Sequence, residues 1–192
     1  MKIILASKSP RRIEILHKHG IDAVTMPMDT DESLPDGIGM EQAVELLARR
    51  KAEACYDAVH GDPSYAGHII IGADTIVWKD EIMGKPADRA DAFRMLDKIR
   101  GTVHYVVTGV ALIDVDSGEC TILDDITEVY CKAYTDADIN EYLDMEEPYD
   151  KAGSYAIQGW FGRHIDHING DYENVVGLPY YRIAEQLKQY MV

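Results

Sequence analysis

Apolar and polar residues at the start of the chain predict a strand followed by a helix. Residues 2–6 are apolar after the first lysine and are expected to form a buried strand. A helix over residues 10–19 is expected next, because Ser9 suits the N-cap, Pro10 suits the first helical position and Gly20 is a helix stop. The chain therefore begins with a strand, a polar turn and a helix.

The following segments continue this alternation. Residues 22–28 predict a second strand, and the acidic residues 29–39, which include proline and glycine, predict a loop. Apolar residues at helical spacing then predict an amphipathic helix over residues 41–57. Residues 57–67 are expected to form an exposed connection.

A further strand and helix are expected in the middle of the chain. Residues 68–77 are rich in β-branched side chains and predict a strand. The run is interrupted at residues 72–74, as expected where a strand bends or where backbone comes close to a ligand. Asp88 can cap the next helix, which should end at Gly101.

Two longer β segments follow, over residues 103–115 and 121–133. The residues between them, Asp-Ser-Gly at 116–118, are typical of a hairpin turn. Because strands and helices alternate early and a long hairpin comes later, we expect an α/β fold with a mixed sheet. The rest of the chain is expected to hold a short helix over residues 135–145, loops and short strands over residues 148–177, and a closing helix over residues 179–190.

The composition limits the size and class of the protein. A hydrophobic fraction of 46% in 192 residues supports one compact unit, or two lobes that share a core, so we expect a single domain over residues 1–192. Apolar runs near the N-terminus are too short for a signal peptide or a membrane span, so we expect a cytoplasmic protein with no membrane partner. Cys55, Cys120 and Cys131 are far apart and are expected to be free, buried thiols.

The formal net charge of −15 makes binding to nucleic acid unfavourable. Against this background, the segment from Lys8 to Arg12 holds three cations and no acid. Backbone N–H groups at a helix N-terminus attract phosphate, so Ser7, Ser9, Arg11 and Arg12 are candidates for a phosphate cradle. The local pattern fits equally well a capped helix whose arginines are solvated on a surface turn.

Other candidates for chemistry are scattered along the chain. Asp74 follows an apolar run; it either lies in a cleft, where it could hold Mg²⁺ or orient water, or bonds its own backbone in a turn. Glu32 is a second possible metal ligand; the alternative is that its acidic loop is simply solvated. Lys51 has the pattern of a surface lysine on a helix, whereas Lys85 is held between a glycine and a proline. The Gln158 amide could pair with the edge of a base.

Taken together, these segments resemble the Maf family of nucleotide pyrophosphatases, once described as septum-formation inhibitors. The motifs occur in family order over nearly the full length of the chain. They are Ala6-Ser7-Lys8-Ser9-Pro10-Arg11-Arg12, Asp31-Glu32, Lys51-Ala52, Gly72-Ala73-Asp74-Thr75, Gly84-Lys85-Pro86, Thr108-Gly109-Val110, Asp150-Lys151-Ala152-Gly153-Ser154-Tyr155-Ala156-Ile157-Gln158-Gly159, Gly170-Asp171-Tyr172 and Asn174-Val175-Val176-Gly177-Leu178-Pro179.

The resemblance implies a mixed β-sheet with flanking helices, similar to that of inosine triphosphatases, in two lobes around a central cleft. It also implies a homodimer, a divalent cation such as Mg²⁺, Mn²⁺ or Co²⁺, and hydrolysis of a nucleoside triphosphate to the monophosphate and pyrophosphate. Asp74 would be the catalytic proton acceptor and, with Glu32, would bind the metal. The substrate-binding residues that the resemblance implies are Ser9, Arg11, Arg12, Glu32, Lys51, Thr75, Lys85 and Gln158.

The same resemblance also suggests which base the nucleotide substrate carries. Gly-Ala-Asp-Thr at residues 72–75, with Ile-Gln-Gly at 157–159, is similar to the family branch that acts on dTTP and UTP. On that pattern Arg11, Thr75 and Gln158 would select a pyrimidine, in canonical or modified triphosphates. Trp160 departs from the family pattern beside the expected base pocket.

Other activities remain open from the sequence. A sister branch that acts on 7-methyl-GTP has Gln at the position of Thr75. A nucleotide-binding regulator of cell division without turnover and a nucleotidyltransferase are the further alternatives.

Overall fold

The computed structural model describes residues 2–145 and 147–190. Within them the chain forms seven strands and six α-helices, joined by loops and short 3₁₀ turns. The strands are β1 (Lys2–Leu5), β2 (Val24–Thr25), β3 (His68–Trp78), β4 (Ile82–Met83), β5 (Val103–Asp114), β6 (Cys120–Cys131) and β7 (Ile165–Asn169). The helices are α1 (Pro10–Lys18), α2 (Met40–Val59), α3 (Arg89–Ile99), α4 (Asp136–Leu143), α5 (Tyr172–Val176) and α6 (Tyr180–Leu187).

All seven strands belong to one mixed sheet. The order is β2-β1-β3-β5-β6-β7, and β4 pairs with β3 outside this path. β1 runs parallel to β2 and β3, whereas β4 is antiparallel to β3 and β7 is antiparallel to β6. The expected α/β fold with a mixed sheet and flanking helices is confirmed.

The chain divides into two compact units. The first comprises Met1–Asp74, Thr108–Asp125 and Gly177–Val192, and the second comprises Thr75–Val107 and Ile126–Val176. The long strands β3, β5 and β6 each contribute residues to both units. A single domain over residues 1–192 and a central cleft stay predictions.

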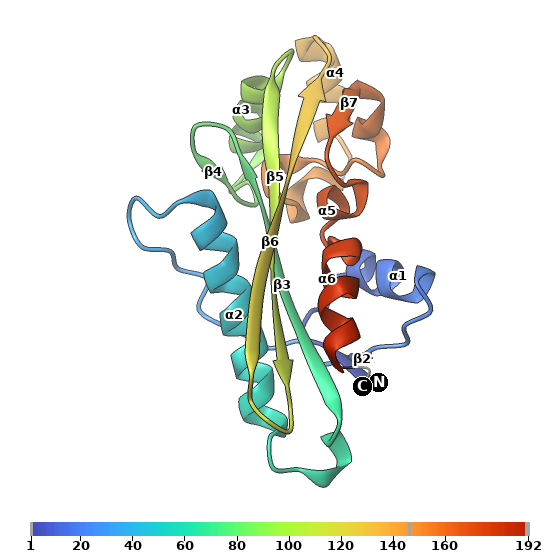
Figure 1. Ribbon diagram of the computed structural model, residues 1–192. Coiled ribbons are helices and arrows are strands. Elements are labelled where there is room, and N and C mark those ends of the chain that lie inside the picture. The colour runs from blue at the N-terminus through green and yellow to red at the C-terminus, as the bar shows by residue number, and fades with distance from the viewer. Residues whose placement is uncertain (1, 146, 191–192) are drawn as a thin grey trace. The chain divides into compact units, whose positions relative to one another are not determined.

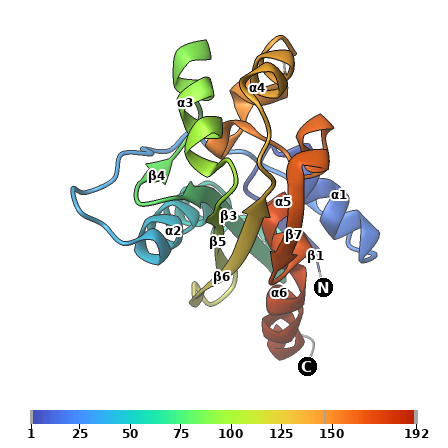
Figure 2. The ribbon, with the colours of Figure 1, turned by 90° about the horizontal axis from the view of Figure 1, so that it is seen from above.

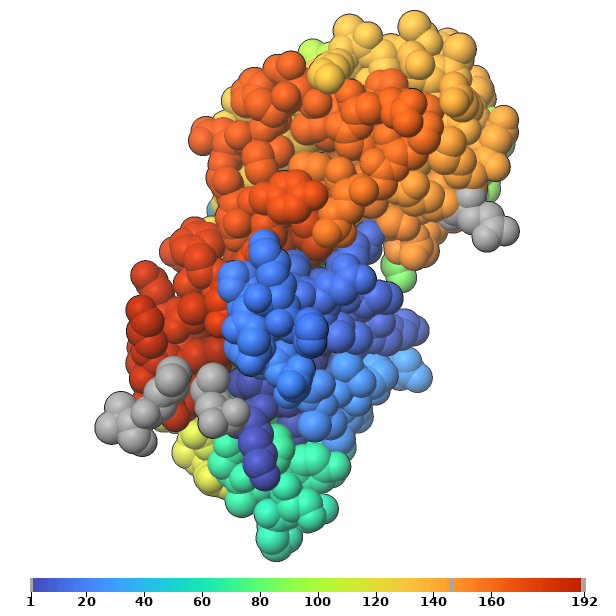
Figure 3. All heavy atoms as spheres, turned by 90° about the vertical axis from the view of Figure 1, so that its right-hand side faces the viewer, coloured from blue at the N-terminus to red at the C-terminus, as the bar shows by residue number. Residues whose placement is uncertain are grey.

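In the first unit, α2 packs on one face of the strands, and α1 and α6 lie on the opposite face (Figures 1 and 2). Under α2, a buried cluster joins Ile4 of β1, Ile70 of β3 and Ala111 of β5 to Ala48 and Ala52 of the helix. An early part of the chain, in blue, lies beside a late part, in red, in Figure 3. This neighbourhood is held by a ring stack between His19 and Tyr180, whose centroids are 3.7 Å apart.

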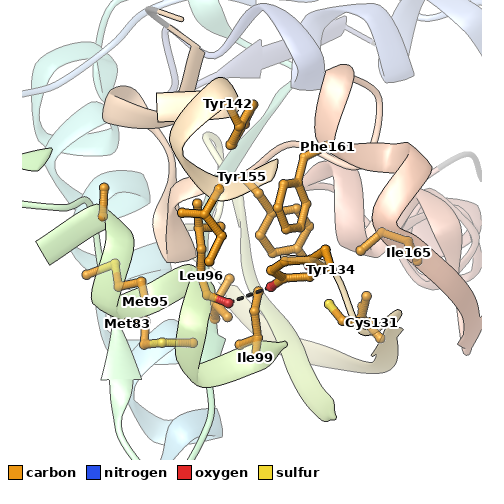
Figure 4. Packing of buried hydrophobic residues seen from close by; sticks show 14 of the residues in the cluster. Met83, Met95, Leu96, Ile99, Cys131, Tyr134, Tyr142, Tyr155, Phe161 and Ile165 are labelled. Carbon is orange, nitrogen blue, oxygen red and sulfur yellow. Dashed lines mark hydrogen bonds between the residues drawn. The ribbon is translucent and has the colours of Figure 1, made fainter. Parts of the chain in front are cut away.

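The core of the second unit contains a group of aromatic side chains among aliphatic ones. Tyr134, Tyr142, Tyr155 and Phe161 pack together with residues of α3 (Figure 4). The Tyr134 hydroxyl donates a hydrogen bond to the backbone carbonyl of Leu96, so this buried phenol is paired. The cluster thus connects α3 and α4 with the irregular segment over residues 147–164.

Several elements begin and end where the sequence predicts. Ser9 is the N-cap residue of α1, and Asp88 caps α3 by accepting from the backbone N–H of Asp91 at 2.9 Å. Thr135 forms a reciprocal capping box with Asp138 at the start of α4. The hairpin turn lies between β5 and β6, as expected. Gly118, in this turn, has a positive φ, which lets the chain reverse direction there.

Other local predictions were wrong. The strand expected over residues 22–28 is only the two residues of β2, and β4 was not foreseen. Residues 148–177 contain 3₁₀ turns, α5 and one strand, rather than mainly loops and short strands. All three cysteines are free, but Cys120 is exposed, so the expectation of a buried thiol was wrong there. None of the helices among the described residues has the length and apolar character needed to cross a membrane.

Candidate active site

Lys51 joins two carboxylates in the first unit. Its Nζ lies 2.5 Å from Asp74 Oδ1 and 3.0 Å from Glu32 Oε1. The side chains of Lys51 and Asp74 are only 14% and 15% exposed, whereas that of Glu32 is 64% exposed. Lys51 is therefore not the solvated lysine that its helical pattern suggests, and Asp74 and Glu32 are brought to one cation.

The packing of α2 on β3 explains this arrangement. A Cβ atom on Gly72 would lie 2.4 Å from the Ala48 carbonyl oxygen and 2.7 Å from the Ala52 nitrogen, so the helix backbone comes close to the strand only because residue 72 is glycine. Lys51 is the neighbour of Ala52 on that helix. The close approach thus places its ammonium over Asp74, two residues after Gly72.

The local predictions for residues 72–74 need correction. β3 runs without a break from His68 to Trp78, so Gly72 does not interrupt the strand. Asp74 is not in a turn either, because it lies inside the strand and pairs with a lysine 23 residues away. The glycine serves contact between the strand and α2.

The polar turn between β1 and α1 is held by Ser7 and Arg12. The buried Ser7 Oγ accepts from the Ser9 backbone N–H at 3.2 Å and from Arg12 Nη1 at 3.1 Å. Arg12 Nε also donates to the Gly177 carbonyl at 2.8 Å, which ties the turn to the segment before α6. The Ser9 side chain makes no capping bond to α1. The hydroxyl of Ser9 is therefore not used in the way that the capped-helix interpretation requires.

The charge of Arg12, in the turn between β1 and α1, interacts with the carboxylate of Asp74. Burial lowers the pKa of the Arg12 guanidinium, the negative charge of Asp74 raises it, and the positive charge of Arg11 lowers it. Arginine stays protonated under such influences, so Arg12 is a fixed cation near Asp74. A partly buried guanidinium at a helix N-terminus suits a phosphate group.

The other predicted residues belong to the second unit. Thr75 follows Asp74 on β3 and is half-buried. Lys85 is exposed in the loop between β4 and α3, where the neighbouring Gly84 carbonyl accepts from the Gly153 N–H at 3.0 Å. Gln158 is exposed in a turn between two 3₁₀ segments. The roles of these three residues in substrate binding stay predictions.

Trp160, the residue that departs from the family pattern, is packed against protein groups. Its ring stacks on Tyr142 with an interplanar angle of 9°, and the Arg163 guanidinium lies 4.3 Å from its ring centroid. The backbone N–H of Trp160, two residues after Gln158, donates to Glu147 Oε2 at 3.4 Å. Trp160 therefore anchors the turn that carries Gln158 to the core of the second unit.

The donor set around Lys51 fits a hard divalent cation. Two carboxylate oxygens already converge on one positive charge, and oxygen ligands are those that Mg²⁺ and Mn²⁺ prefer. In the described part of the chain, no group of three or more His, Cys, Asp or Glu side chains is arranged to hold a metal. A cation bound here would thus need additional oxygen ligands from water or from substrate phosphate.

One residue near the site was missed by sequence reasoning. Arg50 donates from Nη1 to the backbone carbonyls of Asp31 and Ser33, at 2.8 and 2.7 Å, on either side of Glu32. The only local signal is its place next to Lys51 in a basic run, which carries no information about a loop 17 residues away.

The chain is similar to known proteins over its full length. A family model described as Maf-like protein matches residues 2–190. The dTTP/UTP pyrophosphatase of Acetivibrio thermocellus is 42% identical over 100% of this chain and 96% of its own. That of Desulforamulus reducens is 43% identical over 99% and 97%, and that of Geotalea uraniireducens is 46% identical over 97% and 94%. Among solved structures, the Staphylococcus aureus Ham1 protein matches 68% of this chain and 72% of its own, with a TM-score of 0.44 and 14% identity.

Proposed function

The chain belongs to the Maf family, and on this premise we propose that it is a nucleoside triphosphate pyrophosphatase that hydrolyses dTTP and UTP to the monophosphate and pyrophosphate. Relatives that carry this name match nearly the whole chain at 38–46% identity. The structural observation that supports the proposal is the ion pair of Lys51 and Asp74, joined by Glu32 and close to Arg12.

In the proposed reaction some of these side chains bind the phosphates, and Asp74 acts on the attacking water. A triphosphate carries up to about four negative charges, which repel an attacking water until cations neutralise them. Arg12, Arg11 and Lys51 supply positive charge, and Ser9 with the backbone at the start of α1 supplies hydrogen-bond donors. The Asp74 carboxylate orients a water and accepts its proton as the water attacks the α-phosphorus. The bond between the α- and β-phosphates breaks, and pyrophosphate leaves.

A divalent cation completes this proposal. Asp74 and Glu32 would hold Mg²⁺ or Mn²⁺, with Co²⁺ as a further candidate, because both present carboxylate oxygens to one cation. When bound, the ion would neutralise phosphate charge and acidify a coordinated water. Lys85 is proposed to bind phosphate, and Arg11, Thr75 and Gln158 to select the pyrimidine. A homodimer in the cytoplasm is proposed from the family resemblance.

The first experiment measures pyrophosphate release from dTTP, UTP, the other canonical triphosphates and 7-methyl-GTP, with Mg²⁺, Mn²⁺ or Co²⁺. We expect dTTP and UTP to be the best substrates. Asp74→Asn should lower kcat by on the order of 10²-fold or more under saturating metal and substrate, because the amide cannot accept the proton. Asp22→Asn is the matched control, since this carboxylate is exposed and lies 4.0 Å from His17.

Other results would redirect the assignment. Preference for 7-methyl-GTP would move the chain to the sister activity, and orthophosphate as first product would indicate a γ-phosphatase. Binding of dTTP without any product would favour a regulator of cell division. If Asp74→Asn kept most of its activity, Asp74 would not be the proton acceptor.

A further inference from the structure

The loop that carries Glu32 is hydrogen-bonded to the side chain of Arg50. Residues 29–35 form neither helix nor strand, so no ladder of backbone hydrogen bonds sets the position of Glu32. Arg50 Nη1 donates to the carbonyl oxygens of Asp31 at 2.8 Å and Ser33 at 2.7 Å. These two peptide groups flank Glu32, so one guanidinium holds the chain on both sides of it.

The loop is shaped to accept this contact. The Asp31 carboxylate accepts from the Ser33 backbone N–H at 2.9 Å and from its hydroxyl at 2.7 Å, which closes a tight turn with Glu32 between the two residues. The turn is therefore closed by hydrogen bonds within the loop itself.

The ion pair of Glu32 with Lys51 is open to water on the Glu32 side. The Glu32 side chain is 64% exposed, and ion pairs of exposed groups contribute little to stability because water screens them. The bonds from Arg50 are charge-assisted and engage backbone, and its side chain is only 29% exposed. Arg50 is also the residue before Lys51 on α2, so one turn of helix presents both groups to the loop.

From this geometry we propose that Arg50 is a positioning residue that holds Glu32 in place for binding of the metal and triphosphate. It acts through the backbone carbonyls of Asp31 and Ser33 and touches neither metal nor substrate. The proposal rests on the proposed function, in which Glu32 is a metal ligand. Without Arg50 the loop would have to be ordered during binding, which weakens affinity and leaves the chemical step unchanged.

Arg49 gives a matched control. It is the preceding arginine of the same helix, and its Nε pairs with Glu53 Oε1 at 2.7 Å, one helical turn along α2. Arg49→Ala and Arg50→Ala remove the same charge from neighbouring positions. A difference between the two variants therefore reports on the hydrogen bonds from Arg50 to the loop and not on the change in net charge.

The test compares Arg50→Ala, Arg50→Lys and Arg49→Ala by three measurements. These are the Kd for Mn²⁺ without nucleotide, from the electron paramagnetic resonance of free Mn²⁺; steady-state kinetics with dTTP; and amide hydrogen exchange of residues 29–39. For Arg50→Ala we expect a Kd and a KM raised by about 3- to 10-fold, a kcat within about 2-fold, and faster exchange in the loop. Arg50→Lys should recover part of the affinity, and Arg49→Ala should resemble the wild type.

A second background isolates the role of Glu32. In Glu32→Gln, adding Arg50→Ala should raise the Kd for Mn²⁺ no further, because the ligand that Arg50 positions is already lost. Equal behaviour of the two arginine variants, or an undiminished effect of Arg50→Ala in the Glu32→Gln background, would overturn the proposal. If the wild type hydrolysed no triphosphate, the proposed function would fail, while Mn²⁺ binding and hydrogen exchange would still decide the role of Arg50.

Discussion

At the scale of single residues, the ammonium of Lys51 shows how a common side chain acquires a special environment. It is largely buried between Asp74 and Glu32, although it lies in a basic run of an amphipathic helix. Two carboxylates of like charge would repel each other in the partly buried site without this cation. Lys51 therefore stabilises the arrangement before any substrate binds.

This dependence predicts the stability of a pair of variants. Lys51→Met should lower the free energy of unfolding by about 1–3 kcal/mol, because it leaves the Asp74 carboxylate partly buried without its cation. Adding Asp74→Asn should recover most of that loss, because no charge is then stranded. Urea unfolding at pH 7 measures both, with Lys2→Met at the exposed start of β1 as the control. Additive losses in the double variant would show that the two side chains are not coupled.

At the scale of elements, the contact of α2 with β3 decides the geometry of the site. The helix crosses the strand where Gly72 leaves room, and its apolar side packs on Ile4, Ile70 and Ala111. The starts of α1, α3 and α4 could be predicted because they depend on neighbours in sequence. The short β2 could not, because residues 22–28 favour a strand locally but pair with β1 over only two positions.

The close contact predicts the effect of a single methyl group. Gly72→Ala would place Cβ 2.4 to 2.8 Å from backbone and side-chain atoms of Ala48 and Ala52, so the helix must shift. We expect a loss of about 1–3 kcal/mol in unfolding free energy, measured by urea denaturation, together with loss of pyrophosphatase activity as Lys51 moves. Gly84→Ala is the control for stability, because a Cβ there has no atom within 4 Å. Equal stability of the two variants would refute the packing argument.

At the scale of the whole molecule, acidic charge surrounds cores that contain almost no ionised groups. The formal charge is −15, yet the buried polar residues carry hydroxyl, amide or imidazole side chains and no carboxylate, ammonium or guanidinium group. His104 of β5 is fully buried; its Nε2 lies 2.6 Å from the Tyr155 hydroxyl and its Nδ1 3.8 Å from Cys131 Sγ. Burial, with a smaller contribution from the charge of Lys79, lowers the pKa of His104 to about 3.

This imidazole predicts a pH dependence of global stability. Between about pH 6.5 and 3 the unfolded chain binds a proton that folded His104 rejects, so stability is lost as the pH falls through this window. The contribution approaches about 1.4 kcal/mol per pH unit. Urea unfolding between pH 7 and 5 should therefore show a shallower slope for His104→Gln than for the wild type. Parallel curves for the two proteins would show that folded His104 is protonated normally.

The amino-acid sequence by itself determined the features that depend on near neighbours. These are the strand, turn and helix at the N-terminus, the cap at Asp88, the start of a helix at Thr135, and the hairpin between β5 and β6. Its motifs also carried the family resemblance, which the comparisons confirmed. Tertiary structure alone decided which groups meet: Lys51 with Asp74, and Arg50 with the loop of Glu32. The physical reason is range, because propensity and periodicity act over a few residues, whereas these contacts join groups 17 to 23 positions apart through the packing of α2.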